Sequence, residues 1–451
     1  MKDTNFIREN NARHFWLPMA HPREMLEQPP IVITKGEGVE IEDIDGHRVL
    51  DGVGGLWCTN LGHSSQPIKE AIAKQLEELP YYNSFRSTTT APTIELSWML
   101  REYFQADGLS RCFLTSGGSD SVETALRLAR QYHRITGQPE RTKYFSLMRG
   151  YHGTHFGGAS VNGNANFRRN YEPMLPGCFH LPAPFLYRND YDLSDGEALV
   201  ARIAAKFEAE IEFQGANTIA ALIMEPVLGA GGVIVPPESL FPTMRKICDK
   251  HGILLISDEV ITAYGRAGSA SGSRLWGVKP DIMTTAKAIT NGYFPLGAVM
   301  ISDKIAEAFE ANADTRGVIS HGYTYSGHPV GAAAAIATIK EISRLNVAEN
   351  ARLRGAELLA GLQALEQKYE LIGNVRGQGL MVAMELVSDR AAKTPAGKGT
   401  VGTLFTTAYK AGLMTRTSGN NIILSPALII TSADVQRILA CLEEGLAAAS
   451  A

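Results

Sequence analysis

The sequence predicts an α/β protein, with a mostly parallel sheet between helices in a large domain and a smaller α+β domain built from both chain ends. Short apolar runs alternate with helical patterns through the middle of the chain, which is typical of a parallel sheet covered on both faces. The two flanks carry different patterns, and no low-complexity linker interrupts the chain. We therefore expect residues 66–329 to form the large domain, and residues 1–65 and 330–451 to form the small one.

Six apolar runs bounded by Gly, Pro or polar residues are the predicted strands of the large domain. They are Arg111–Leu114, Lys143–Met148, Ile219–Met224, Ile253–Ser257, Ile282–Thr285 and Ala298–Ser302. Helices are predicted at Ser119–Thr136, which has apolar residues at 122, 125, 126 and 129, and at Phe241–His251, which stops before Gly252. Since ligands bind at the carboxyl ends of such strands, the residues that follow each run are the first candidates for a site.

The flanking segments carry the patterns expected of a second domain. Residues Ile31–Gly54 alternate Val and Ile with charged residues around a turn-like Asp45-Gly46, which indicates an antiparallel meander. Towards the other end, we expect a helix at Gly331–Ser343, a strand at Val375–Glu385 and an amphipathic helix at Ser432–Ala449.

Composition excludes several classes of protein. The chain has 451 residues, is 45% hydrophobic, and carries 43 Lys and Arg against 47 Asp and Glu, without a long basic run. Nucleic acid is therefore not an expected partner. Five scattered cysteines without a C-x-x-C pair indicate reduced thiols rather than a disulfide framework. We expect a cytoplasmic protein that is not bound to a membrane, since the N-terminal segment lacks an uninterrupted apolar region and no run of about 18 apolar residues occurs.

An acid and an amine follow two of the predicted strands. Asp258 comes directly after the run Ile253–Ser257, and Lys287 follows the run that ends at Thr285. A carboxylate beyond a buried strand needs a partner that offsets its desolvation. Taken alone, such an Asp can also be a helix cap or a surface acid.

An anion cradle and an aromatic follow two other strands. The stretch Thr115-Ser-Gly-Gly-Ser119 places small residues and free backbone N–H groups at the start of the long helix, where an anion can bind. It matches neither G-x-G-x-x-G nor the P-loop, so a dinucleotide or P-loop fold is not indicated. Tyr151 follows the run Lys143–Met148. The alternatives are an ordinary glycine-rich turn and a packing aromatic.

Together, these groups describe a site for a planar, charged and phosphorylated cofactor. Pyridoxal 5′-phosphate needs an amine for a Schiff base, a carboxylate for its pyridinium nitrogen, an aromatic face and a phosphate cup.

At these residues the sequence resembles the class III, fold type I pyridoxal-phosphate aminotransferases, over about Ile31 to Leu446. The stretch Leu254-Leu-Ile-Ser-Asp-Glu-Val-Ile-Thr-Ala-Tyr-Gly-Arg266, followed by Pro280-Asp281 and Ala286-Lys287, carries the resemblance. The family's large domain has a mostly parallel seven-stranded sheet. The resemblance implies that Lys287 binds the cofactor and shuttles the substrate proton, and that Asp258 holds the pyridinium.

The resemblance also implies further cofactor contacts and a homodimer with shared active sites, with dimer or tetramer left open. Val260 and Tyr151 would cover the two ring faces, Gly118 and Ser119 would form the phosphate cup, and Thr324 would reach the neighbouring subunit's phosphate. Glu225 matches an acid near the cofactor, although it can also be a structural acid held by a buried hydrogen bond. His321 and His328 lack further ligands at metal spacing, so no metal is expected.

Two departures and one match indicate the branch of the family. Relatives that act on ornithine or 4-aminobutyrate with 2-oxoglutarate have Gln where this chain has Ile261, and Glu in a loop that here reads Gly229-Ala230-Gly231. Arg416 matches the mobile arginine of pyruvate-dependent ω-amino acid and amine transaminases, which would grip a carboxylate and swing away from an uncharged amine.

Trp57 and Phe85 also resemble this branch, in which they would line the substrate pocket with Ala230; the alternative is that they are core aromatics. Arg86 stands where several relatives have a second aromatic. It either favours donors with a distal anion or is a solvated surface residue.

The expected activity is transfer of an amino group from a primary amine or ω-amino acid, such as β-alanine or a diamine, to pyruvate. The products are an aldehyde or ketone and alanine, formed in a ping-pong reaction. The alternative within the fold is a pyridoxal-phosphate aminomutase or decarboxylase. A nicotinamide dehydrogenase lacks its dinucleotide fingerprint here, and a non-catalytic binding protein would not need the lysine and the acid.

Overall fold

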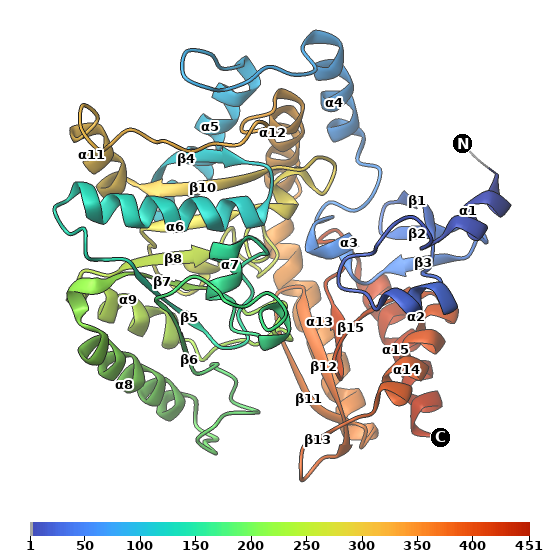
Figure 1. Ribbon diagram of the computed structural model, residues 1–451. Coiled ribbons are helices and arrows are strands. Elements are labelled where there is room, and N and C mark those ends of the chain that lie inside the picture. Colours follow the sequence, from blue (N-terminus) through green and yellow to red (C-terminus); the bar gives the residue numbers. More distant parts are fainter. Residues whose placement is uncertain (1–2) are drawn as a thin grey trace.

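A seven-stranded sheet forms the centre of the protein, which a computed structural model describes over residues 3–451 (Figure 1). Its strands are β4 (Leu109–Thr115), β5 (Lys143–Leu147), β6 (Cys178–Leu181), β7 (Ile219–Met224), β8 (Leu254–Asp258), β9 (Ile282–Thr285) and β10 (Gly297–Ser302). They lie in the order β4-β10-β9-β8-β7-β5-β6. Only β10 runs antiparallel to its neighbours among these strands. The predicted mostly parallel sheet is confirmed.

All six predicted strands are present, and the seventh, which the resemblance implied, is β6, whose position the sequence pattern did not predict. It is a four-residue edge strand that pairs only with β5, and three of its residues are partly exposed. A short strand at an edge keeps polar residues such as His180, so it lacks the continuous apolar run by which buried parallel strands are recognised.

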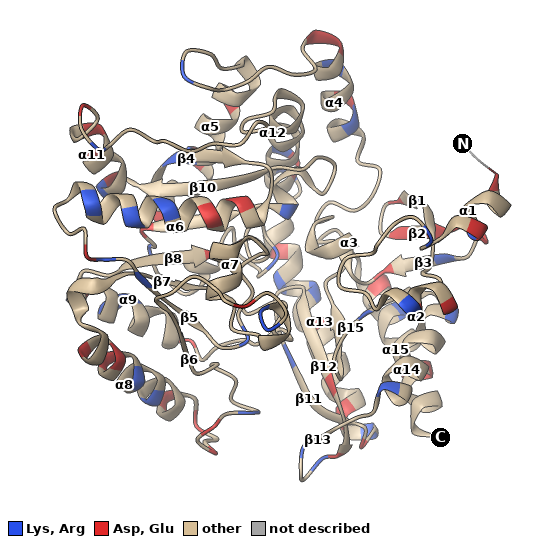
Figure 2. Cartoon of the chain, in the orientation of Figure 1, with Lys and Arg blue, Asp and Glu red and all other residues tan. Residues whose placement is uncertain are grey.

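Helices cover both faces of this sheet. On one face lie α6 (Gly118–Ile135) and α11 (Asp303–Ala311). On the other lie α5 (Ala91–Phe104), α8 (Gly196–Gln214), α9 (Leu240–His251) and α12 (Pro329–Arg344). The sheet is therefore buried on both sides, as its apolar strands require. Figure 2 shows acidic side chains near the N-terminal end of α6 and basic ones towards its other end, which is the favourable order for the helix dipole.

Segments from the two chain ends share a second sheet. It consists of β1 (Ile33–Glu37), β2 (Glu40–Asp43) and β3 (Arg48–Asp51), the predicted meander, with β14 (Leu413–Met414) parallel to β3. Figure 1 shows blue and red elements side by side there. A small domain built from both chain ends, as predicted, requires this pairing of β3 with β14. The domain boundaries at residues 65 and 329 remain predictions.

The predicted single strand at Val375–Glu385 is wrong. Two antiparallel strands occupy that region, β11 (Ile372–Gln378) and β12 (Met381–Asp389), joined by a two-residue turn. Gly379 in this turn has φ +57°, and a Cβ there would lie 2.5 Å from backbone atoms of the Arg266–Ala267 segment. A continuous apolar run, Leu380–Met384, begins inside this tight turn, so the sequence pattern does not show where the first strand ends.

The remaining elements complete these layers. The helices are α1 (Thr4–Asn10), α2 (Pro22–Glu27), α3 (Gly54–Trp57), α4 (Gln66–Glu78), α7 (Phe156–Val161), α10 (Gly272–Leu275), α13 (Val347–Lys368), α14 (Lys398–Lys410) and α15 (Ser432–Ser450). The strands β13 (Thr394–Pro395), β15 (Arg416–Ser418) and β16 (Asn421–Leu424) join β11 and β12. Four 3₁₀ turns are η1 (Gln105–Asp107), η2 (Ala165–Phe167), η3 (Ala216–Thr218) and η4 (Lys287–Thr290). No helix within residues 3–451 has the length and apolarity to cross a membrane.

Arg266 ties the segment after β8 to both chain ends. Its guanidinium is fully buried and donates to the carbonyl oxygens of Leu380 and Pro426, at 3.0 and 2.5 Å, and to Asn60 Oδ1 at 2.7 Å. Burial lowers its pKa to about 9. Because three segments far apart in the chain share this one donor group, Arg266 fixes how they lie against each other.

Replacing Arg266 by Met should lower the free energy of unfolding by about 3 kcal/mol, because three buried acceptors lose their donors. Urea denaturation followed by circular dichroism measures this difference. Arg352→Met on the exposed face of α13 is the control and should leave the midpoint unchanged. Equal denaturation midpoints for both variants would contradict a stabilising role of the three Arg266 hydrogen bonds.

Candidate active site

The carboxyl ends of five strands meet at one cavity of about 380 Å³. Residues that follow β4, β5, β7, β8 and β9 line it, as is expected where parallel strands end together. Seven of the site residues predicted from the sequence are brought together there: Gly118, Ser119, Tyr151, Glu225, Asp258, Val260 and Lys287.

Asp258, the last residue of β8, is buried and surrounded by donors. His152 Nδ1 lies 2.8 Å from its Oδ2. Thr284 Oγ1 and the Val260 amide donate to its Oδ1, each at 3.2 Å. The His152 side chain is fully enclosed, and its Nε2 has no partner among the described residues. The carboxylate is thereby held in one orientation towards the cavity.

Sequence reasoning missed His152 as a site residue. It stands next to Tyr151, directly after β5, so a polar residue beyond a buried strand was the available signal. Which carboxylate it would meet depends on how β5 and β8 lie in the sheet.

Lys287 follows β9 in a strained backbone conformation. Its φ is +50°, which is rare for a residue with a side chain and common at functional sites. Burial lowers the pKa of its amine, while the nearby carboxyls of Asp258 and Glu225 oppose that shift. A lowered pKa leaves a larger fraction of neutral amine, which is the nucleophilic form.

The start of α6 forms the predicted anion cradle. Gly118 is the first residue of this helix, and a Cβ there would lie 3.0 Å from Val260 Cγ1. Ser119 Oγ accepts a hydrogen bond from the Thr154 amide at 3.1 Å. Glycine therefore lets the helix N-terminus approach Val260 closely, and the free N–H groups of its first turn face a cavity of cofactor size.

Glu225 ties together the loops after β5 and β7. It is buried, and its two oxygens accept from the amides of Tyr151 and Gly229, both at 2.9 Å. Burial, together with the charge of Asp258, raises the pKa of this carboxyl to about 7. It thus lines the cavity and is also held by buried hydrogen bonds, so the two sequence interpretations describe one residue.

Arg416 lies near Tyr151 and Lys287 at the start of β15. Burial lowers the pKa of the half-buried Arg416 guanidinium, and the nearby Tyr151 hydroxyl opposes that shift. The charge of Arg416 in turn contributes to the lowered pKa of Lys287. Within residues 3–451 the Arg416 guanidinium has neither a hydrogen bond nor an ion pair. An arginine without a partner is what the loop Gly229-Ala230-Gly231, which lacks an acid, predicts.

None of the predicted substrate residues, Arg416 included, is among those that line this cavity. Trp57 is 2% exposed and packs in a cluster with Val227, Ile261 and Met381, while its neighbours Leu56 and Cys58 line the cavity. Ala230 is half-buried beside Gly229.

Phe85, Arg86 and Thr324 lie away from the chain's own cavity. Phe85 and Arg86 are exposed and line a separate hollow of about 1070 Å³ with Phe113 and His321. Thr324 is exposed as well, and its carbonyl oxygen accepts from the Tyr81 hydroxyl at 2.7 Å. The described chain has no group of three or more His, Cys, Asp or Glu residues arranged to hold a metal.

A buried acid, a buried amine, an aromatic and a helix N-terminus around one cavity at the end of a parallel sheet define a pyridoxal-phosphate-dependent transferase of fold type I. Residues 22–446 match the family "Aminotransferase class-III", and the chain belongs to this family. It is therefore an enzyme, an aminotransferase that uses pyridoxal 5′-phosphate.

Relatives in several organisms support this assignment. A putrescine–pyruvate aminotransferase of Pseudomonas aeruginosa is 34% identical over 440 residues, 96% of this chain and 95% of that protein. A mitochondrial gamma-aminobutyrate transaminase of Oryza sativa subsp. indica is 35% identical over 421 residues, 93% of this chain and 81% of that protein. The structure of a PLP-bound amine transaminase from an uncultivated Pseudomonas species has a TM-score of 0.94 and 46% identity, covering 96% of this chain and 98% of that one.

Glu225 should make the stability of the apoenzyme fall as pH rises. Its pKa rises from 4.5 to about 7 on folding, so between those values the folded state retains a proton that the unfolded state has lost. The resulting loss of unfolding free energy between pH 4.5 and 7 is about 3 kcal/mol. Urea denaturation across this range should show that the difference between wild type and Glu225→Gln changes by this amount. Glu212→Gln, at an exposed position of α8, should leave the profile unchanged, and parallel profiles for the wild type and Glu225→Gln would refute the shift.

Proposed function

We propose that the enzyme transfers the amino group of a primary amine or an ω-amino acid, such as β-alanine or a diamine, to pyruvate. The products would be an aldehyde or ketone and alanine, formed in two half-reactions at one site. The observation that carries the proposal is Arg416, a half-buried guanidinium near Lys287 and Tyr151 without a partner in the described chain.

The residues around the cavity would have different roles in the reaction. When bound, pyridoxal phosphate supplies an aldehyde that amines attack and a protonated ring that draws off the electrons of a broken C–H bond. Asp258 would keep the ring nitrogen protonated, since His152 and Thr284 hold its carboxylate in place. Lys287 would take the proton from the substrate carbon and return it, which its lowered pKa favours.

The other predicted residues would bind and orient. Val260 and Tyr151 would pack on the two faces of the ring, and Gly118 and Ser119 would hold the phosphate at the start of α6. Glu225 would keep Tyr151 in place through its bond to the Tyr151 amide.

Substrate choice would follow from a free arginine in an apolar surrounding. Arg416 can bind a keto acid carboxylate with two parallel hydrogen bonds, and it has no acid that competes for it in the described chain. Ile261, with Leu56 and Phe294, gives the cavity an apolar wall for the body of an amine. The name of the P. aeruginosa relative, a putrescine–pyruvate aminotransferase, agrees with an amine donor and pyruvate. Phe85 and Ala230 would complete the substrate pocket, and Trp57 would support it from the buried cluster that it shares with Ile261.

A second copy of the chain would complete each site. Phe85 and Thr324 lie on the surface, away from the cavity of their own chain, where another subunit could receive them. Exposed apolar residues surround them: Tyr82, Ile94, Trp98, Val318, Ile319 and Tyr325. We infer a homodimer, or a tetramer built from it. The five cysteines are all free thiols, which supports a cytoplasmic location.

Replacing Lys287 by Ala should lower turnover by about 10³-fold or more, since the proton carrier is lost. Borohydride treatment should fix the cofactor covalently to the wild-type chain and leave it removable from the variant, as read by absorbance after dialysis. A variant that still completes both half-reactions at the normal rate would overturn the assignment of Lys287.

Replacing Arg416 by Ala should lower kcat/KM for pyruvate by about 10²-fold, because two charge-assisted hydrogen bonds to the carboxylate are lost. The same parameter for a neutral aldehyde acceptor should change little. Arg416→Lys keeps the charge but lacks the planar guanidinium, so its kcat/KM for pyruvate should lie between the values of the wild type and Arg416→Ala. Equal losses for pyruvate and aldehyde would remove the carboxylate-binding role and, with it, the main support for pyruvate.

A further inference from the structure

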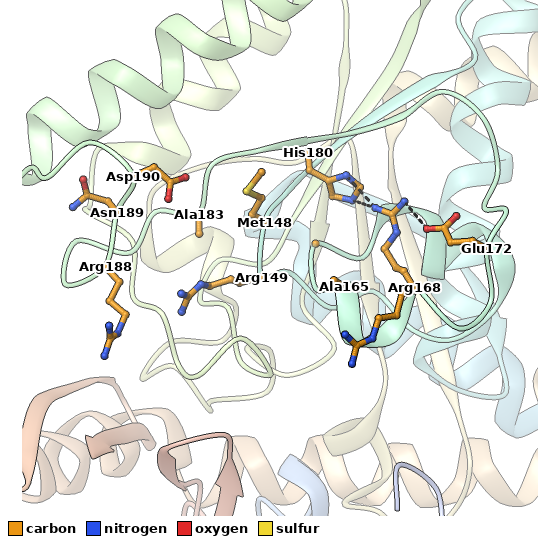
Figure 3. A pocket seen from close by; sticks show the side chains of 12 residues that line it. Met148, Arg149, Ala165, Arg168, Glu172, His180, Ala183, Arg188, Asn189 and Asp190 are labelled. Carbon is orange, nitrogen blue, oxygen red and sulfur yellow. Dashed lines mark hydrogen bonds and ion pairs between the residues drawn. The ribbon is translucent and has the colours of Figure 1, made fainter. Parts of the chain in front are cut away.

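A second cavity, of about 500 Å³, lies beside β5 and β6 and is rich in arginine (Figure 3). Its lining comes from the residues after β5, from η2 and the residues that follow it, and from the loop after β6. The arginines are Arg149, Arg168, Arg169 and Arg188, and the acids are Glu172 and Asp190. None of its lining residues belongs to the cofactor cavity.

The side chains of Arg169 and Arg149 have no hydrogen bond or ion pair within residues 3–451, but Arg169 is exposed, whereas Arg149 is half-buried. Its guanidinium stands 5.1 Å from the ring centre of Phe185, and burial lowers its pKa. The backbone amide of Arg149 donates to the carbonyl oxygen of Gly163 at 2.8 Å, so only its guanidinium is left without an acceptor in the described chain. Arg168, by contrast, is bound to His180 and to Glu172, as the dashed lines in Figure 3 show.

Positive charge is in excess around Arg149. Arg188 Nε and a guanidinium nitrogen of Arg376 contact the same buried carboxylate, Glu385, at 2.6 and 3.3 Å. Arg376 also stands 4.6 Å from the Phe185 ring, and the charges of Arg149 and Arg188 contribute to lowering its pKa to about 10. Three guanidinium groups therefore lie around one carboxylate. Asp190 is close enough to raise the pKa of Arg149, against the effect of burial, but it does not pair with Arg149. Such a cluster is stabilised by an added anion.

We infer that this cavity binds a small organic carboxylate, with Arg149 as its principal donor. The planar fork of a guanidinium matches the two oxygens of a carboxylate. Met148, Ala165 and Ala183 add an apolar wall, which suits a carbon skeleton better than a bare inorganic oxyanion. The inference does not depend on the proposed function.

The carboxylate site is distinct from the cofactor cavity but adjoins it. Phe167, in η2 next to Arg168, packs edge to face on Tyr151 with ring centres 5.0 Å apart. Tyr151 lines the cofactor cavity and Arg168 lines the second one, so this ring contact joins residues that surround the two cavities. The carbonyl oxygen of Arg149 also packs against Gly231, in the loop held by Glu225.

Calorimetric titration of the holoenzyme with succinate tests the site, at constant ionic strength set with chloride. The titration uses Arg416→Ala as background, so that carboxylates bound by Arg416 do not contribute. We expect one succinate per chain, and at least about 10-fold weaker binding when Arg149→Met is added, which corresponds to one lost charge-assisted hydrogen bond. The control Arg169→Met, at an exposed arginine on the rim of the same cavity, should change the affinity less than 2-fold.

Three results would overturn the inference. They are no binding of succinate to Arg416→Ala, equal binding with and without Arg149→Met, and sulfate binding as tightly as succinate, which would indicate a site for inorganic oxyanions.

If Arg149→Met does not fold, arginine modification of the wild-type holoenzyme gives an independent answer. Succinate should protect Arg149, but not Arg169, from phenylglyoxal, as measured by peptide mass spectrometry. Equal modification with and without succinate would refute the site.

Discussion

The buried carboxylate of Asp258 is the group on which the rest of the site depends. Burying a charged group at the end of a central strand, away from water, is unfavourable in free energy unless hydrogen-bond donors surround it. His152, from the loop after β5, and Thr284, on β9, provide them together with the Val260 amide. Because these donors come from the neighbourhood of three strands, satisfying this one carboxylate also fixes how the strand ends lie around the cavity.

A second acid, Glu225, lines the same cavity. Glu225 is buried and accepts from two backbone amides, and burial raises its pKa to about 7. These two hydrogen bonds join the loop that carries Tyr151 to the loop of Gly229. Lys287 lies near both acids with a strained backbone and a lowered pKa. Strain and desolvation thus concentrate where the chemistry takes place.

Two arginine side chains without partners in the described chain distinguish the surroundings of the cavity. Arg416 lies near Tyr151 and Lys287, which line the cavity, and Arg149 lines the second cavity. The other buried arginines, such as Arg266 and Arg376, donate to carbonyl or carboxylate oxygens. A desolvated guanidinium without an acceptor is unfavourable in the protein alone, which is the physical reason to assign both to anionic ligands.

Local patterns in the sequence determined the elements and the residues at the strand ends, because a buried parallel strand needs a continuous apolar run and a site residue must follow it. That was enough to predict six of the seven central strands and the grouping of Asp258, Lys287, Gly118 and Tyr151, whereas Glu225 was expected there only from the resemblance to the family. Partners from distant segments were decided only by the tertiary structure. The His152–Asp258 contact, the hairpin at Gly379 and the packing of Trp57 away from the cavity depend on which strands become neighbours and how closely they approach, and hydrophobic periodicity along the chain carries no information about either.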